Sequence, residues 1–289
     1  MSGIAALNTT PLAELLAVAD TKWVLGHWYI KVMHNGRSVG DFTSLAGIVQ
    51  EELGQTRSMF RYIEDEANLA SGYLEHGREA NEIRSMHILD RPPTGWGDFI
   101  VTMALAESAS LSLCEAIADQ LSPEDELNGL LKKIFQEEYF HELLSRGWLQ
   151  TLAGLDLAGA QAALNGETGR LVGAFQWFGW EGGGGNGSGS LSKAARMKCE
   201  KKILSMLSEG GTCDTGAVTE AAENARRMKA DGWDEVRHRP STTAIPAALW
   251  EFMVPTSAAA LLARRPRDIA FDDDFSTAGK DFDEYVQEG

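Results

Sequence analysis

Apolar residues recur at three- and four-residue steps along the first two thirds of the chain, whereas the alternation typical of β-strands is scarce. This spacing is typical of amphipathic helices. We expect Asp41 and Asp98 to cap the second and third helices, because aspartate accepts hydrogen bonds from the free N–H groups of a first turn. The pattern predicts four long helices, at about 10–33, 41–67, 98–121 and 122–154.

The connections between these helices indicate their arrangement. The first and second helices, and the third and fourth, are joined by short turns and should be antiparallel neighbours. The connection from the second to the third is long and contains a short helix, as in ferritin-like bundles with one crossover. Further helices are predicted at about 158–180, 193–207 and 218–230. The glycine-rich stretch 181–192 is either a linker or a mobile lid or docking loop.

These features predict an all-α fold, a ferritin-like four-helix bundle core with additional C-terminal helices. We expect a single domain over 1–289. Its core would cover about 10–155. A helical extension would cover about 156–235. The rest, about 236–289, would be a peripheral tail whose end is acidic.

Composition narrows the class of partner. The formal net charge is −16 over 289 residues, which disfavours nucleic acid because phosphate neutralisation needs a basic surface. No apolar run is long enough to span a bilayer, and the N-terminus lacks the features of a secretory signal. Cys114, Cys199 and Cys213 form no paired motif, which fits a reducing compartment. We therefore expect a cytoplasmic protein that binds neither membrane nor nucleic acid.

The fourth predicted helix contains the most informative motif. Glu138 and His141 are three residues apart and share one helical face. Leu131, Ile134 and Leu144 recur around them, so this face is predicted to point into the core. A buried carboxylate is costly unless it is paired, hydrogen-bonded or bound to metal. An inward Glu-x-x-His pair is a hallmark of di-iron carboxylate bundles.

The other three helices each supply an acid. Glu52 and Gln55 repeat the same spacing on the second helix, with glutamine in place of histidine. Glu107 lies in an apolar run on the third helix, and Asp20 lies on the first with Lys22 close by. Carboxylates and imidazole suit iron, and manganese remains open. The predicted metal ligands are Asp20, Glu52, Gln55, Glu107, Glu138 and His141.

The chain resembles the phenylacetic acid catabolic family, the helical subunits of ring-1,2-phenylacetyl-CoA epoxidase. The resemblance covers roughly Leu15 to Leu207. Its anchors are the segments 49–55, 96–98, 137–141, 145–149 and 176–179. The family has a catalytic branch with a di-iron centre and a structural branch that has lost ligands. Glu52, Glu107, Glu138 and His141 match the catalytic branch, whereas Gln55 stands where that branch has histidine.

Two residues of the first helix could occupy its position in the site. Counting back 30 from Glu52 gives Lys22, which cannot ligate a metal as an ammonium, and counting back 32 gives Asp20, which can. An inward Lys22 would instead replace a metal by neutralising the acids, as a buried salt-bridge cluster. The amide oxygen of Gln55 is a weaker ligand than imidazole, so it would loosen a second metal site.

The resemblance implies the oxygenase component of a multicomponent di-iron monooxygenase, with Glu52 and Glu138 as catalytic residues. Its substrate would be a small aromatic molecule, possibly CoA-linked, and Lys193, Arg196 and Lys198 would bind the CoA phosphates. Electrons would come from a separate flavin/iron–sulfur reductase, and a related helical subunit would be a partner. Two alternatives remain, a metal-free scaffold subunit of such a complex and a metal-binding bundle with another role.

Overall fold

The computed structural model describes residues 3–9, 11–165, 170–179, 188–209, 215–227, 232–234 and 236–254. Within these residues the fold is an all-α helical bundle with one two-stranded β-hairpin, which confirms the predicted class. The predicted acidic tail and most of the glycine-rich stretch lie outside the described residues. In chain order, the described α-helices are α1 Leu12–Val32, α2 Val39–Ala67, α3 Tyr73–His76, α4 Trp96–Ala118, α5 Glu126–Asn165, α6 Arg170–Gln176, α7 Ser188–Glu209, α8 Thr215–Arg227 and α9 Ala247–Met253.

Short 3₁₀ helices and the hairpin complete the described elements. The antiparallel strands β1 and β2 pair Trp233 with Pro240 and Asp234 with Arg239. The 3₁₀ segments are Gly3–Asn8, Met33–Asn35, Ala80–Glu82 and His87–Asp90, and β1 and β2 span Trp233–Asp234 and Arg239–Pro240.

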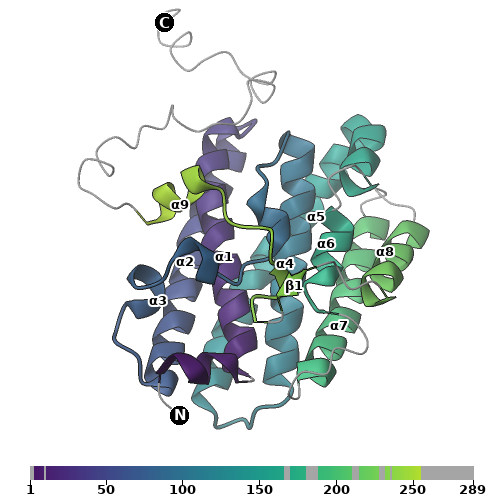
Figure 1. The fold of residues 1–289 in the computed structure, drawn as a ribbon. Coiled ribbons are helices and arrows are strands. Elements are labelled where there is room, and N and C mark those ends of the chain that lie inside the picture. The colour runs from purple at the N-terminus through teal and green to yellow at the C-terminus, as the bar shows by residue number, and fades with distance from the viewer. Residues whose placement is uncertain are drawn as a thin grey trace, which may run out of the picture.

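Four long helices, α1, α2, α4 and α5, form the bundle that holds the site (Figure 1). The α1–α2 and α4–α5 connections are short, and the α2–α4 connection is long and contains α3, as predicted. Helices α6 and α7 pack against the α4 side of the bundle, and α8 packs on α6 and α7 (Figure 1). The extra helices therefore cover α4 and leave α2 and α5 with exposed faces.

Helix α4 is the most apolar element. By length and composition it is the one described helix that could cross a membrane, but 94% of its most apolar window is buried inside the bundle. It is hydrophobic on all sides because neighbours cover it on all sides. In this structure α4 is the core helix of the bundle.

Several predicted helix boundaries are wrong. The single helix predicted at 158–180 is replaced by the end of α5, which runs to Asn165, and by α6, Arg170–Gln176. Ser38 caps α2 by accepting a hydrogen bond from the Asp41 N–H, so Asp41 lies inside the first turn. Gly95 is the N-cap residue of α4, and Asp98 lies in its first turn. Helix α5 continues through Gly154, because one glycine inside a helical pattern weakens a helix without ending it. The predicted core boundary at 155 therefore falls within α5.

Candidate functional site

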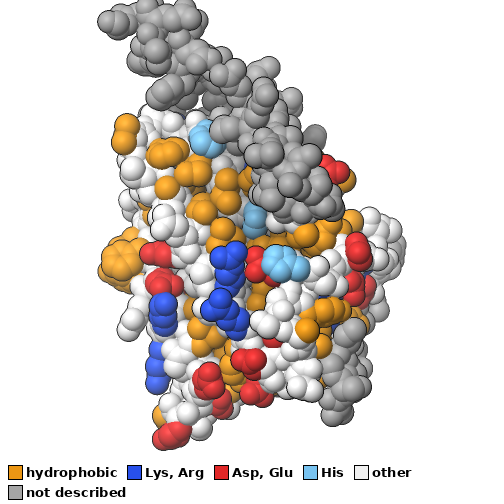
Figure 2. All heavy atoms as spheres, turned by 90° about the vertical axis from the view of Figure 1, so that its left-hand side faces the viewer, with side chains coloured by type: hydrophobic (Ala, Val, Ile, Leu, Met, Phe, Trp, Pro, Cys, Tyr) orange, Lys and Arg blue, Asp and Glu red, His pale blue; other side chains and the backbone are white. Residues whose placement is uncertain are grey.

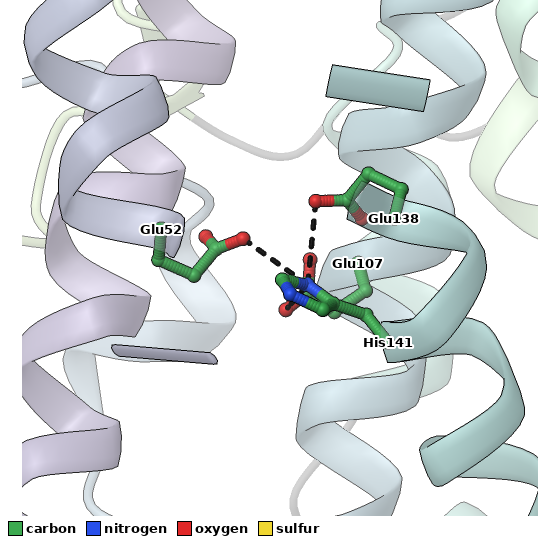
Figure 3. A group of neighbouring side chains, drawn as sticks. All are labelled: Glu52, Glu107, Glu138 and His141. Carbon is green, nitrogen blue, oxygen red and sulfur yellow. Dashed lines mark ion pairs between the residues drawn. The ribbon is translucent and has the colours of Figure 1, made fainter. Parts of the chain in front are cut away.

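Four predicted ligands converge in the centre of the bundle. Glu52 lies on α2, Glu107 on α4, and Glu138 and His141 on α5, and their side chains point toward one another (Figure 3). One ligand atom from each lies within 4.8 Å of the others, and all four side chains are buried. The Glu-x-x-His motif therefore faces inward as predicted. Such a group of oxygen and nitrogen atoms could hold a metal ion.

Lys22 on α1 lies inside this cluster. Its Nζ atom is 2.6 Å from Glu138 Oε1, 2.8 Å from Glu52 Oε1 and 3.5 Å from Glu107 Oε2. The Lys22 side chain has no exposed surface. Its ammonium therefore bridges carboxylates from α2, α4 and α5, which is where a cation shared by these helices would lie.

His141 links the buried cluster to a partly exposed acid, Glu51. Its Nδ1 lies 3.3 to 3.6 Å from oxygens of Glu138, Glu52 and Glu107. Its Nε2 lies 2.7 Å from Glu51 Oε2, and the Glu51 side chain is 40% exposed. Glu51 was not predicted as a site residue. Its position next to Glu52 on a helix turned toward α5 is the signal that could have identified it.

Tyr29 is a second site residue that the sequence did not reveal. Its hydroxyl donates a 2.6 Å hydrogen bond to Glu107 Oε1, and the side chain is fully buried. Tyr29 lies seven residues after Lys22, two turns along α1, so both side chains point to the same side of the helix. That spacing was the available signal. Glu107 is thus held by a neutral donor as well as by the Lys22 ammonium.

Charge balance explains how the cluster stays buried. Burial alone would lower the pKa of Lys22, but Glu138, Glu52 and Glu107 raise it well above its usual value. Burial lowers and the three carboxylates raise the pKa of His141, with the net effect upward. Both groups are therefore cationic at neutral pH.

The two carboxylates nearest Lys22 titrate differently. Burial raises the pKa of Glu138, but Lys22 and His141 lower it well below its usual range. Burial and the nearby Glu107 raise the pKa of Glu52 to about 7, although Lys22 opposes this shift. Lys22 thus acts as the counter-ion that keeps Glu138 ionised inside the core.

Asp20, the predicted first-helix ligand, is not part of the cluster. Its two carboxylate oxygens accept hydrogen bonds from the Arg78 guanidinium, at 2.8 and 2.5 Å, and one also accepts from the Arg84 backbone N–H. Two residues along a helix turn the side chain by about 200°, so Asp20 and Lys22 point to opposite sides of α1. Lys22 therefore takes the inward position, and Asp20 anchors the α3 region.

Gln55, predicted as a weak ligand, bonds elsewhere. Its amide Nε2 donates a 3.0 Å hydrogen bond to Glu137 Oε2 on α5. Its Oε1 atom is buried and has no hydrogen-bond partner in the described part of the chain. The amide therefore links α2 to α5 at the outer edge of the site.

The donor set differs from that of a two-metal bundle. Such a centre uses a carboxylate from each of two helices and a Glu-x-x-His pair from each of the other two. Here the first helix supplies Lys22, an ammonium without a lone pair, and α2 supplies Gln55 in place of a histidine. Only Glu52, Glu107, Glu138 and His141 converge. The residues present do not fit a di-iron centre in this arrangement.

Space on the α7 side of the cluster is small. A cavity lined by Glu107 and Glu138, and closed by Lys202 and Met206 of α7, has a volume of about 10 Å³. That is room for about one water molecule. Small-molecule sites enclose about 300 Å³ or more. This cavity therefore cannot accept an aromatic ring next to the cluster.

The three residues of α7 that were predicted to bind CoA phosphates, Lys193, Arg196 and Lys198, have different surroundings. Lys198 Nζ lies 3.1 Å from Asp119 Oδ2, at the C-terminal end of α4. Arg196 is buried and donates a hydrogen bond to the Gly179 carbonyl. Lys193 is exposed. Two of the three predicted CoA-binding residues therefore bond within the chain.

The fold and site define a class, a helical carboxylate bundle with an inward Glu-x-x-His pair. Comparison with protein-family models gives the family itself. Residues 3–163 match the model described as phenylacetic acid catabolic protein. The chain belongs to this family, which links it to phenylacetate catabolism. A comparison with curated proteins found no match.

Proposed function

We propose that this chain is the metal-free scaffold subunit of a multicomponent oxygenase acting in phenylacetate catabolism. The observation that carries the proposal is the position of Lys22. Its ammonium lies 2.6 and 2.8 Å from Glu138 and Glu52, so it supplies the positive charge that a metal would otherwise supply.

Two further observations support this role. Gln55 bonds to Glu137, and a two-metal bundle would need a histidine at this position. The cavity beside Glu107 and Glu138 has a volume of about 10 Å³, too small for an aromatic substrate. In this proposal a related catalytic subunit holds the metal, binds the aromatic, CoA-linked substrate and receives electrons from a flavin/iron–sulfur reductase.

The cluster contributes to such a scaffold by joining helices. Lys22 of α1 bonds to Glu52 of α2, Glu107 of α4 and Glu138 of α5, so one side chain connects all four bundle helices. A buried ion pair that loses one partner leaves an uncompensated charge, which is strongly destabilising. Helix packings that separate Lys22 from these carboxylates are therefore disfavoured. The cluster therefore favours one packing of the four helices.

The oxygenase component itself is the second candidate. It is favoured by the proximity of Glu52, Glu107, Glu138 and His141, whose ligand atoms lie within 4.8 Å of one another. A metal at this point would be held by these four residues and would supply oxygen activation. Lys22 would then have to leave the cluster or lose its proton, against a pKa raised well above its usual value.

Metal analysis separates the two candidates. The chain purified from iron-supplemented cells is expected to contain no stoichiometric iron or manganese, and Glu138→Ala should leave that result unchanged. A metal content of about two irons per chain, the occupancy of a complete carboxylate bundle, would contradict the scaffold proposal if Glu138→Ala abolished it. Copurification with a metal-containing relative in a stable complex would support it.

A further inference from the structure

A groove runs between α2 and α5 on the outside of the bundle. It has a volume of about 280 Å³, and its lining residue Glu51 contacts His141 of the buried cluster. Its apolar lining comes from Leu130 and Ile134 of α5. The volume is close to the lower limit of small-molecule sites, so the groove has room for a large side chain of a docked segment.

Gln55 places a buried hydrogen-bond acceptor at this groove. The residue lines the groove and is only 3% exposed. Its Nε2 atom donates to Glu137, but its Oε1 atom has no hydrogen-bond partner in the described part of the chain. A buried acceptor without a donor is costly. The groove is therefore completed by an occupant that donates a hydrogen bond.

Four exposed cations surround one end of the groove and are called the basic patch below. They are Arg57 and Arg61 on α2 and Lys132 and Lys133 on α5. The contact between Gln55 and Glu137 fixes the antiparallel register, which brings both lysines level with the two arginines. Lys133 also lines the groove itself. An occupant of the groove therefore meets positive charge at this end.

The described residues neutralise this patch only in part. Arg57 pairs with Glu75 at 3.1 Å, and Lys133 lies 3.8 Å from Glu137. No ion pair among the described residues involves Arg61 or Lys132. On the side of the molecule where α2 lies, Lys and Arg side chains gather at mid-height, and Asp and Glu side chains lie mainly below them (Figure 2). The patch is thus a local excess of positive charge on a chain of net charge −16.

The sequence contains a segment with the complementary chemistry. The acidic segment Phe271–Gly289 holds seven acidic residues and one lysine, with aromatic residues at Phe271, Phe275, Phe282 and Tyr285. Residues 255–270 before it hold three arginines and one aspartate, so the negative charge is confined to the segment. Clusters of arginine and lysine are a recurring way to bind acidic motifs. Aromatic side chains between the acids suit an apolar groove beside such a cluster.

The segment is long enough to reach the groove. Phe252 of α9 lies 5.8 Å from His27, measured between ring centroids. A Cβ atom at the neighbouring Gly26 would lie 3.1 Å from Leu53, so α9 lies at about the height of the groove along the bundle. The path around α2 is about two helix diameters, about 20–25 Å. The residues from 255 to Phe271 span up to about 55 Å when extended.

We infer that the acidic segment of this chain docks in the α2–α5 groove and covers the basic patch. Its acids pair with Arg61, Lys132 and Lys133, and an aromatic side chain contacts Leu130 and Ile134. A backbone N–H group or the Tyr285 hydroxyl donates to Gln55 Oε1. The inference does not depend on the proposed function or on whether the chain binds metal.

Photo-cross-linking within the purified full chain tests the docking. Gln50 is exposed and lines the groove, so Gln50→p-benzoylphenylalanine places a light-activated group beside the expected occupant. Irradiation followed by trypsin and mass spectrometry should join this position to Asp268–Lys280 or Asp281–Gly289 of the same molecule. A mixture of ¹⁵N-labelled and unlabelled chains identifies cross-links within one molecule, because those pair only peptides with the same label.

Charge reversal tests the basis of the docking. Arg61→Glu with Lys133→Glu should lower the cross-link yield by about fivefold or more, since two exposed ion pairs are lost. Adding Asp272→Lys, Asp273→Lys and Asp274→Lys to this variant should restore the yield. High salt should lower the yield of the wild-type sequence by screening the same pairs.

The controls lie on α7. Lys193→Glu with Lys201→Glu changes the net charge equally at exposed positions and should leave the yield unchanged. Met197, 64% exposed on α7, is the control position for the photo-reactive group and should give no cross-link to the acidic segment. Circular dichroism would verify that every variant keeps wild-type helix content.

Four results would overturn the inference. Position 50 could give no cross-link to residues 268–289, or it could cross-link to a second copy or another protein in their place. The yield could be the same after reversal of Arg61 and Lys133 as in the α7 control. Position 197 could capture the acidic segment as well as position 50 does.

Discussion

Lys22 on α1 and Glu138 on α5 are joined by a 2.6 Å ion pair between Nζ and Oε1, and both side chains are buried. The two residues are 116 positions apart in the sequence. Each has a cost of burial that the other offsets, together with Glu52, Glu107 and His141. This pair connects the first and last helices of the bundle and decides how the acidic cluster is neutralised.

Replacing Lys22 with methionine should destabilise the chain strongly. The substitution keeps the length of the side chain but removes the cation between Glu52 and Glu138. We expect a loss of about 3–5 kcal/mol at neutral pH, the usual cost of breaking a buried pair. Urea denaturation measures it. Lys133→Met, which removes an exposed 3.8 Å pair with Glu137, should change stability by less than about 1 kcal/mol. Equal effects of the two variants would contradict a counter-ion role for Lys22.

Restoring the missing ligands should create metal binding. The double variant Lys22→Glu and Gln55→His would complete the carboxylate and histidine set of a two-metal bundle. Without a metal its excess negative charge should lower the thermal midpoint, and added Fe²⁺ or Mn²⁺ should raise it by linkage. Differential scanning calorimetry with and without metal measures this. The same metals should leave the midpoint of the wild type unchanged, and a metal response of equal size in both chains would refute the expectation.

Asp20 should matter for stability and not for the cluster. Asp20→Asn weakens its bonds to the Arg78 guanidinium and leaves that charge buried without its counter-ion. We expect a loss of about 3–5 kcal/mol of unfolding free energy in urea. Asp65→Asn, at an exposed position on α2, is the control and should stay within about 0.5 kcal/mol. A stable Asp20→Asn chain that had lost a bound metal would instead restore the original ligand prediction.

His87 should make the fold sensitive to acid. Burial, with Arg239 and Arg91 nearby, lowers its pKa from 6.5 to about 4. The unfolded chain binds this proton at higher pH than the folded chain does. The stabilising contribution is therefore complete above about pH 6.5 and is lost as the pH falls to about 4, at a total on the order of 3 kcal/mol.

The slope of stability against pH measures this effect. His87→Gln should lose less unfolding free energy than the wild type between pH 6.5 and 4. His76→Gln is the control, since the His76 side chain is 70% exposed and the substitution should leave the slope unchanged. Parallel wild-type and His87→Gln curves would show that another group controls the acid limb.

The sequence by itself determined the helices and most of the cluster. Three- and four-residue periodicity specifies which side of a helix is apolar, so an acid on that side, such as Glu107 or Glu138, must point inward. The same reasoning identified Glu52 and His141. It placed helix ends less well, because caps such as Ser38 depend on local hydrogen bonds that several nearby residues can make.

Only the tertiary structure decided between Asp20 and Lys22. Both lie on α1, two residues apart, and both have polar side chains in an apolar run. Arg78, which neutralises Asp20, comes from the irregular crossover between α2 and α4, where periodicity carries no information about position. Because Asp20 and Lys22 lie about 200° apart around α1, the orientation of α1 that brings Asp20 to Arg78 also places Lys22 among the acids of α2, α4 and α5. Charge compensation between distant segments thus decided that an ammonium, and not a carboxylate, faces the acidic cluster. Such compensation depends on the three-dimensional arrangement of those segments.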